Sequence, residues 1–311
     1  AYMQPFALGF PLLMAIMGIN GVLRGQGEAK KTSFISISYA AANWVLDPIL
    51  ITGAFRFAGP GLARAAHATL AGWLIGRPSG FYLLGRTALP FQPSKVTDCQ
   101  LGPSLKAIGG VAGPAAFSNA INPIGLSVLT ALVATQGQAA VAGFGAAGRL
   151  QSFSVVPLLA LSGAIGAIVG QNWGADKADR SRQAMIWAAG FCVVYGLALA
   201  AVLFFGGAWF ADFFTQDQAV IEEFAAYLSI AAWGYAGYGL LIVSNGALNA
   251  VGKAGWALLQ SCARVVLIML PVAWLLRPAW GSDAIYTAEL AANLIGGAAA
   301  LFIVWRILRK K

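Results

Sequence analysis

The chain has 311 residues, of which 59% are hydrophobic and only 10% are charged, and its mean hydropathy is +0.73. Soluble domains carry about 25% charged residues, so this composition excludes an ordinary soluble protein. The net charge of +9 does not indicate a nucleic-acid partner. The basic residues cluster at the ends of apolar runs, where such residues act as topology signals.

Apolar runs of about 20 residues recur along the chain, long enough to cross a bilayer as helices. They lack the period-two alternation that a transmembrane barrel requires. We therefore predict an all-α polytopic membrane protein. The glycine, proline and charge clusters between the runs predict nine transmembrane helices. These are expected near residues 2–22, 32–54, 62–84, 110–134, 148–171, 184–206, 224–248, 254–276 and 284–305.

Lysine and arginine are unevenly divided between alternate loops. One set of loops carries only Arg56 and Arg277. The other set, together with the C-terminal end, carries Arg24, Lys30, Lys31, Arg86, Lys95, Lys106, Lys177, Arg180, Arg182, Lys253, Arg306, Arg309, Lys310 and Lys311. Cytoplasmic loops are enriched in basic residues. The second side, which includes the C-terminus, is therefore predicted to be cytoplasmic.

A sequence repeat relates the two ends of the chain. Asn20, Gly21, Leu23, Gly27 and Ala29 recur 225 residues later as Asn245, Gly246, Leu248, Gly252 and Ala254, and Tyr2, Ala7 and Gly9 recur as Tyr227, Ala232 and Gly234. Such a repeat predicts a transporter of two related halves. In the second half, about 120 residues with three predicted spans precede the repeated segment. The first half has no such stretch before Tyr2, so we expect three further helices before this chain in the parent protein. That parent would have twelve helices in two lobes, related by an axis along the membrane normal.

The repeat also divides the chain. Residues 1–84 are predicted to be a partial N-lobe containing its last three helices, and residues 109–311 to be a six-helix C-lobe. Residues 85–108 are predicted to be a cytoplasmic linker, because its prolines disfavour a continuous helix. A short interfacial helix is expected within it, around Ser104–Ile108.

Asp47 is the acidic residue most clearly placed inside a predicted span. It lies 16 residues after Lys31, which is about 24 Å along a helix. A carboxylate in hydrocarbon is costly and usually serves a function. Asn43 lies one turn earlier on the same face, Pro48 frees a backbone carbonyl, and Thr69 on the next helix offers a hydroxyl. This set predicts a site for Na⁺ or a proton; the alternative is that Asp47 only braces a proline kink.

The remaining polar residues give weaker signals. Glu289, about 9 Å below the outer surface, is predicted to be structural and able to reach the interface by snorkelling. His67 is the one histidine, so we expect no metal site. With no Ser/His/Asp set and no paired carboxylates within one span, we expect no enzymatic activity and no cofactor.

A group of polar and aromatic residues predicts a substrate cavity in the C-lobe. Asn119 and Asn122 interrupt the fourth span, Gln151 lies at the start of the fifth, and Tyr238 falls in the seventh, with Phe117, Phe153 and Tyr235 in the same group of spans. Such lining suits large amphipathic or cationic ligands. Ordinary helix packing, with asparagine as interhelical glue, explains the same pattern.

Several segments resemble one transporter family. NGVLRGQGEAK at residues 20–30, followed by NWVLDPILITG at 43–53, resembles the elbow and fifth helix of multidrug and toxic compound extrusion (MATE) transporters. Residues 113–175, beginning GPAAFSNAINPIGL, resemble that family's seventh and eighth helices. The similarity extends over the whole chain, from the fourth helix of the family to the twelfth.

This resemblance implies a monomeric, multi-pass antiporter of the bacterial inner membrane, with two six-helix lobes around a central cavity. It would be driven by inward Na⁺ or H⁺ and would export drugs or organic cations. In one branch of the family, coupling uses an Asn and an Asp four residues apart and a Thr on the next helix, which match Asn43, Asp47 and Thr69. Another branch has a carboxylate on the seventh helix, where this chain has Asn122.

Three alternatives remain open at this point. A lipid-linked sugar flippase of the same superfamily would have several basic residues in its cavity, for which Arg64, Arg77, Arg149 and Arg264 are scattered candidates. A membrane-embedded enzyme acting on lipid intermediates is disfavoured by the lack of clustered intramembrane acids and histidines. A non-transporting fragment or structural subunit is the third.

Overall fold

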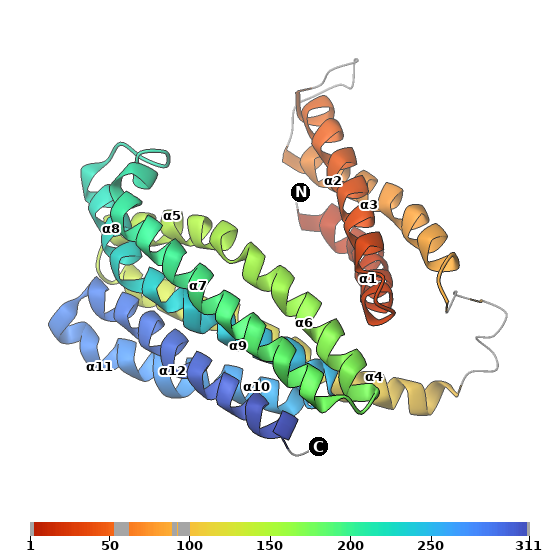
Figure 1. Ribbon diagram of the computed structural model, residues 1–311. Coiled ribbons are helices and arrows are strands. Elements are labelled where there is room, and N and C mark those ends of the chain that lie inside the picture. The colour runs from red at the N-terminus through yellow and green to blue at the C-terminus, as the bar shows by residue number, and fades with distance from the viewer. Residues whose placement is uncertain (1–2, 53–61, 89–91, 93–99, 310–311) are drawn as a thin grey trace. The chain divides into compact units, whose positions relative to one another are not determined.

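The computed structural model describes residues 3–52, 62–88, 92 and 100–309, and these residues are helical apart from short connections (Figure 1). The chain divides into two compact units, Ala1–Cys99 (the N-unit) and Gln100–Lys311 (the C-unit). The helices of the N-unit are α1 (Met3–Gly25), α2 (Ala29–Thr52) and α3 (Leu62–Gly85). Those of the C-unit are α4 (Leu101–Ala134), α5 (Gln138–Ser154), α6 (Val156–Gly174), α7 (Ala178–Ala211), α8 (Gln218–Ala231), the 3₁₀ turn η3 (Ala232–Gly234), α9 (Tyr235–Ala250), α10 (Ala254–Cys262), the π-helical η4 (Ala263–Met269), α11 (Leu270–Trp280) and α12 (Ser282–Arg309).

Seven helical segments of the described chain are long and apolar enough to cross a membrane. They are Ala7–Gly25, Leu101–Ala134, Val156–Gly174, Ala178–Ala211, Gln218–Ala250, Ala254–Trp280 and Ser282–Arg309. The helices α2 and α3 lie where two further spans were predicted, but they are not among the seven. The all-helical membrane architecture is therefore confirmed, whereas the number nine stays a prediction.

Two predicted boundaries are wrong. The expected separate helix around Ser104–Ile108 is the beginning of α4, which runs without interruption from Leu101. Pro103 is tolerated there because a first-turn N–H has no intrahelical acceptor in any case. The expected span 148–171 is divided at Val155, where α5 ends and α6 begins with Pro157 in its first turn.

In the N-unit, α2 and α3 pack closely through two glycines of α3. A Cβ atom at Gly72 would lie 3.1 Å from the Tyr39 carbonyl oxygen and 3.5 Å from Asn43 Cβ, and one at Gly76 would lie 3.0 Å from Tyr39 Cβ. Small residues permit such close approach of helices. The contacts also show that the two helices are antiparallel, with Gly72 beside Asn43 and Gly76 beside Tyr39.

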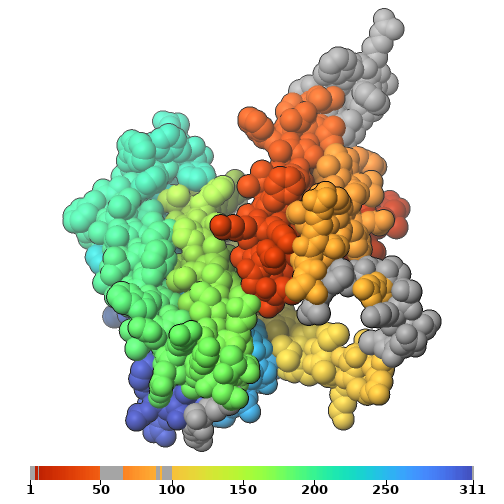
Figure 2. All heavy atoms as spheres, turned by 45° about the vertical axis from the view of Figure 1, so that its right-hand side comes forward, coloured from red at the N-terminus to blue at the C-terminus, as the bar shows by residue number. Residues whose placement is uncertain are grey.

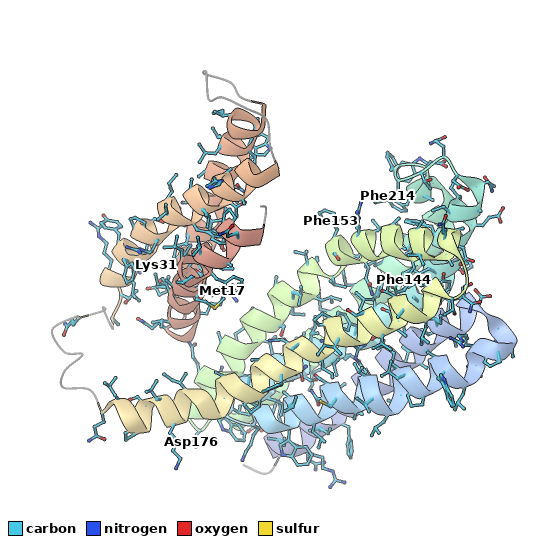
Figure 3. The ribbon with its side chains drawn as sticks, turned by 180° about the vertical axis from the view of Figure 1, so that it is seen from behind. Met17, Lys31, Phe144, Phe153, Asp176 and Phe214 are labelled. Carbon is cyan, nitrogen blue, oxygen red and sulfur yellow. The ribbon has the colours of Figure 1, made fainter. Side chains whose placement is uncertain are left out.

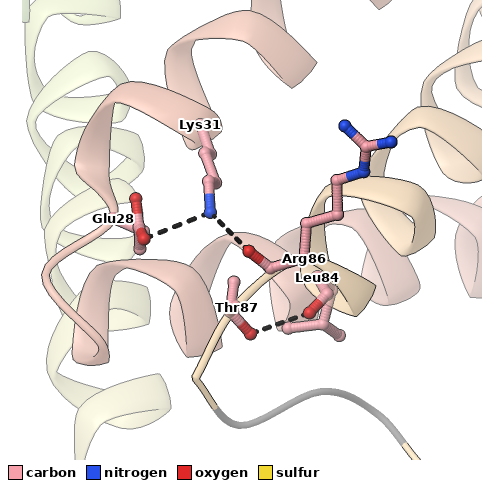
Figure 4. Close-up of polar contacts among 5 residues, drawn as sticks. All are labelled: Glu28, Lys31, Leu84, Arg86 and Thr87. Atoms are coloured by element: carbon pink, nitrogen blue, oxygen red, sulfur yellow. Dashed lines mark hydrogen bonds and ion pairs between the residues drawn. The ribbon is translucent and has the colours of Figure 1, made fainter.

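The elbow between α1 and α2 is fastened to the end of α3 (Figure 4). Lys31 Nζ donates a hydrogen bond to the Arg86 carbonyl oxygen at 3.0 Å and forms an ion pair with Glu28 at 3.1 Å. The Thr87 hydroxyl closes the last turn of α3 by donating to the Leu84 carbonyl oxygen at 2.7 Å. Lys31, in the first turn of α2, thus joins the elbow to the end of α3.

The elbow recurs in the C-unit between α9 and α10, at the positions that the sequence repeat predicts. Gly27 has φ +80° and Gly252 has φ +73°. In each elbow the glycine N–H donates to the carbonyl of the residue three before it, Arg24 or Asn249. Glycine takes positive φ without the steric cost that a side chain brings. The repeat in sequence is therefore also a repeat in backbone conformation at this point.

In the C-unit, α9 is the central helix and packs against α6, α7 and α12. It crosses α12 at Gly237 and Gly297, where a Cβ on either glycine would overlap the facing backbone. Figure 3 shows Phe144 of α5 inside this unit, where its ring meets that of Tyr227 edge-on at 5.3 Å. The side chains of α6 and α7 form one continuous surface in Figure 2. Large apolar residues such as Phe205, 85% exposed, cover α7, as expected for a helix facing lipid.

Candidate functional site

The C-unit encloses a pocket of about 230 Å³ between α4, α5, α9, η4 and α12. Its walls combine apolar side chains with a small group of polar ones. The apolar residues are Pro123, Leu126, Leu129, Val155 and Met269, and the polar ones are Asn122, Gln151, Ser152, Tyr238, Arg264 and Glu289. A mainly apolar cavity with a few convergent polar groups is typical of a ligand-binding site.

Arg264 supplies the positive charge of this pocket. It lies in the π-helical segment η4 and is only 5% exposed. Its guanidinium donates to Asn122 Oδ1 at 2.6 Å and to Asn293 Oδ1. Gly296 of α12 leaves room for it, because a Cβ there would lie 2.7 Å from Arg264 Cγ. Short π-helical insertions often occur at functional sites, and this one carries the buried cation.

Glu289 supplies the negative charge and is 7% exposed. Gln151 Nε2 donates to its Oε1 at 2.8 Å, and the Tyr227 hydroxyl donates to its Oε2 at 3.0 Å. The prediction that Glu289 snorkels to the interface is therefore wrong. Neutral donors from α5 and α8 satisfy its carboxylate inside the bundle, so the side chain has no need to reach water.

The two charges line the same pocket but are bound to different partners. Within the described residues, no salt bridge joins Arg264 to Glu289. Each is instead held by neutral amide or hydroxyl groups, and the Arg264 guanidinium lies 5.5 Å from the centre of the Tyr238 ring. The pocket therefore combines an aromatic face with a cationic and an anionic group.

The structure brings together three of the four residues that the sequence placed in a substrate cavity, namely Asn122, Gln151 and Tyr238. Asn119 is exposed and does not line the pocket. The buried face of α4 includes Ser118, Gly125 and Leu129, with which Asn122 is in helical register. Asn119 lies about 100° away from Ser118 on this helix.

Two of the aromatic residues expected in the same group lie elsewhere. Phe117 and Phe153 are exposed, and Figure 3 shows Phe153 at the surface of α5. Sequence reasoning did not assign Glu289 to the cavity, and it considered Arg264 there only under the flippase alternative. The available signal was their charge within apolar spans, which by itself predicts a buried partner or a cavity.

The predicted cation site lies in the N-unit and is described on its own. Asn43 Oδ1 and Asp47 Oδ1 are inaccessible to solvent, and neither has a hydrogen-bond partner among the described residues. Extending the α2–α3 register by one turn places Ala68 beside Asp47. Thr69, the next residue, is half-buried there. The helix α2 continues through Pro48 to Thr52. The helix α2 thus carries two buried side-chain oxygens one turn apart, and the backbone of the first, at Asn43, packs against Gly72 of α3.

Of the four scattered arginines, Arg264 is the one that lines the C-unit pocket. Arg77 and Arg149 are exposed, and the Arg64 side chain lies outside the described residues. A flippase for lipid-linked sugars was expected to present several basic residues together. Within the C-unit pocket, one arginine is present rather than several.

Comparison with known proteins identifies the family. The model of the MatE family matches residues 114–275, about half of the chain, and this segment contains Asn122, Gln151, Tyr238 and Arg264. The chain belongs to the MATE family of membrane transporters. The resemblance predicted from the elbow and the α4–α6 segment is thereby confirmed.

Individual MATE relatives align along nearly the whole chain. A protein named FAD transporter from Shewanella oneidensis is 31% identical over 306 residues, which cover 98% of this chain and 68% of the relative. The probable multidrug resistance protein YpnP of Bacillus subtilis is 28% identical over 95% of this chain and 63% of its own length. The crystal structure of the Vibrio cholerae MATE transporter VcmN in the bent form matches 95% of this chain and 66% of that chain, with a TM-score of 0.86 and 26% identity. The chain thus spans about two thirds of the length of these relatives.

Proposed function

We propose that this MATE protein is a cation-coupled antiporter that exports amphipathic organic solutes, drugs or organic cations, across the bacterial inner membrane. The coupling ion, Na⁺ or H⁺, would bind at Asn43, Asp47 and Thr69, and the C-unit pocket would hold part of the solute. The protein would act as a monomer of two six-helix lobes, with its C-terminus in the cytoplasm. The observation that carries the proposal is the pair of buried oxygens on α2 that have no hydrogen-bond partner among the described residues.

A cation at this pair would relieve the cost of leaving a carboxylate oxygen buried without a partner. Carboxylate, amide and hydroxyl oxygens are suitable ligands for a hard cation, and a carboxylate also accepts a proton. One charge moving inward through 100 mV releases about 2.3 kcal/mol. That energy supports a concentration ratio of roughly fifty for the exported solute.

The C-unit pocket supports an organic solute with an aromatic part. Tyr238 offers a ring face, Glu289 a negative charge, and Gln151 and Ser152 hydrogen-bonding groups. Its volume of about 230 Å³ lies below the roughly 300–1,000 Å³ of sites for drug-sized ligands. The pocket would therefore bind one ring or head group, while the rest of the solute lies outside it.

The test is Asp47→Asn in the complete gene product, expressed in bacteria and assayed for efflux of a fluorescent organic cation. We expect efflux to fall to the background of the empty vector, with the amount of protein in the membrane unchanged. Asp212→Asn, at the exposed end of α7, is the matched control and should leave efflux intact. Unchanged efflux in Asp47→Asn would refute the coupling proposal.

A second candidate substrate is an anionic flavin nucleotide. The relative that is 31% identical over almost the whole chain is named FAD transporter, and the pocket places the Arg264 guanidinium beside the Tyr238 ring. Guanidinium groups bind phosphate well, and a flavin ring can stack on tyrosine. Export of FAD into the medium, with no efflux of organic cations, would favour this candidate. Cation efflux that FAD does not compete with would favour the first.

A further inference from the structure

Two adjoining concave pockets lie on the C-unit away from the site described above. The first, of about 490 Å³, lies between α7, α9 and α12, and its lining residues are all apolar. They include Ile186, Leu240, Ala298, Leu301 and Trp305. The second, of about 410 Å³, lies between α10 and α12 and is lined by Trp256, Phe302, Ile303, Arg306 and Ile307. Phe302 lines both, so the two pockets adjoin at its side chain along α12, and we refer to them together as the groove.

Small residues on α7, α9 and α12 leave the space that forms the groove. The backbones of α9 and α12 touch at Gly237 and Gly297. Beyond this crossing, Ala298 on α12 and Ala189 on α7 line the first pocket. Alanine side chains do not fill the space between three helices as leucine would. An apolar channel is thus left open beside the lipid-facing surface of the C-unit.

Arg306 gives the groove its charge. It is exposed, its guanidinium lies 5.1 Å from the centre of the Phe302 ring, and no carboxylate of the described chain pairs with it. Arg182, near the start of α7, is by contrast paired with Asp179. Trp256, in the first turn of α10, lines the same pocket, and its indole N–H is a hydrogen-bond donor. The polar end of the groove is therefore cationic and unneutralised.

We propose that this groove binds one anionic phospholipid, with its phosphate at Arg306 and Trp256 and an acyl chain in the apolar pocket between α7, α9 and α12. The groove lies at the correct level for such a ligand. Arg306 is three residues before the end of α12, and Trp256 is two residues after the start of α10. Lipid head groups meet helices at their ends, where tryptophan is also enriched. Basic pockets between transmembrane helices bind anionic head groups on the cytoplasmic side, which is the side predicted for this end.

Native mass spectrometry of the complete protein, with equimolar phosphatidylglycerol and phosphatidylcholine, tests the proposal. We expect one phosphatidylglycerol to be retained in preference to phosphatidylcholine. Arg306→Gln should weaken its binding roughly fivefold, the effect of about one arginine–head-group contact. Arg306→Lys should keep most of the preference. Arg309→Gln removes an equal charge from the same helix, outside the groove, and should have no effect.

Ala298→Leu tests the position of the acyl chain, because it narrows the apolar pocket without changing the charge. It should lower retention of phosphatidylglycerol. Equal retention of the two lipids by the unaltered protein, or equal losses in Arg306→Gln and Arg309→Gln, would overturn the proposal. So would a dimer that Ala298→Leu dissociates, since the groove would then be an interface between two copies. If Ala298→Leu does not fold, the comparison of Arg306→Gln, Arg306→Lys and Arg309→Gln still decides the question.

Discussion

The N-unit and the C-unit differ in how their buried carboxylates are hydrogen-bonded. In the C-unit, both carboxylate oxygens of Glu289 accept a hydrogen bond, and both terminal nitrogens of Arg264 donate one, while Arg264 Nε has no partner in the described chain. In the N-unit, one oxygen of Asp47 and the oxygen of Asn43 are buried without a hydrogen-bond partner in the described chain. A compensated charge can fix a pocket in one shape, whereas an uncompensated oxygen pair is suited to gaining and losing a cation. This difference is the reason why we propose solute binding in the C-unit and ion coupling in the N-unit.

The largest effect is expected where the compensated network is broken. Arg264→Leu leaves the oxygens of Asn122 and Asn293 without their donor. Hydrogen bonds to a charged group contribute about 1.5–3 kcal/mol each, so the free energy of unfolding should fall by about 3 kcal/mol. Thermal unfolding in detergent measures this, with the exposed Arg149→Leu as the control. If Arg264→Leu and Arg149→Leu were equally stable, the hydrogen bonds from Arg264 to Asn122 and Asn293 would not stabilise the C-unit.

A somewhat smaller loss of folding stability is expected from a substitution where α9 crosses α12. Gly297→Ala would push a Cβ into the backbone of Gly237, and overpacking of this kind costs about 1–3 kcal/mol. Gly190→Ala, on α7, is the matched control because nothing lies within 4 Å of a Cβ there. We expect the first variant to unfold at a lower temperature and the second to be unchanged or slightly more stable. The same thermal scan decides between these outcomes.

A graded functional effect is expected at the uncompensated pair. Asn43→Ala removes one of the two buried oxygens but keeps the carboxylate. Efflux should therefore fall about tenfold, corresponding to about 1.4 kcal/mol of weaker cation binding, and raising the concentration of the coupling ion should restore part of it. A variant that stays inactive at every ion concentration would contradict a role in ion affinity.

The smallest effect is expected at the elbow of the N-unit. Lys31→Met removes the ion pair with Glu28 and the bond to the Arg86 carbonyl oxygen. Because exposed ion pairs contribute about 0.2–1 kcal/mol, stability should change by about 0.5 kcal/mol and efflux should remain. The loss should also shrink in high salt. A salt-independent loss of several kcal/mol would show that the elbow does more than hold helix ends together.

Local sequence signals predicted the features that depend on one helix at a time. Apolar runs predicted a helical membrane protein, and the four-residue spacing predicted that Asn43 and Asp47 lie on one face of a helix. The elbow glycines belong to the sequence repeat, and Gly27 and Gly252 share the same positive-φ backbone conformation. In the cavity, Asn122, Gln151 and Tyr238 were recognised because polar residues stand out within apolar spans.

The features that the sequence did not predict depend on packing between distant segments. Arg264 is 142 residues from Asn122 and 29 from Asn293, so only the folded bundle shows that they meet. The same holds for Glu289 with Gln151, 138 residues away. The π-helical segment around Arg264 and the division between α5 and α6 at Val155 likewise have no periodic signature. Helical period places a residue on a face, but it does not say which helix that face meets.

The most direct test of ion coupling at Asp47 is counterflow in proteoliposomes containing the complete protein. An outward solute gradient should drive Na⁺ or H⁺ movement in the opposite direction, detected by radioactive Na⁺ or a pH-sensitive dye. In Asp47→Asn we predict that the solute still binds, as quenching of intrinsic fluorescence would show, but that no counter-ion moves. Counter-ion movement that persists in Asp47→Asn at the unaltered stoichiometry would contradict the account.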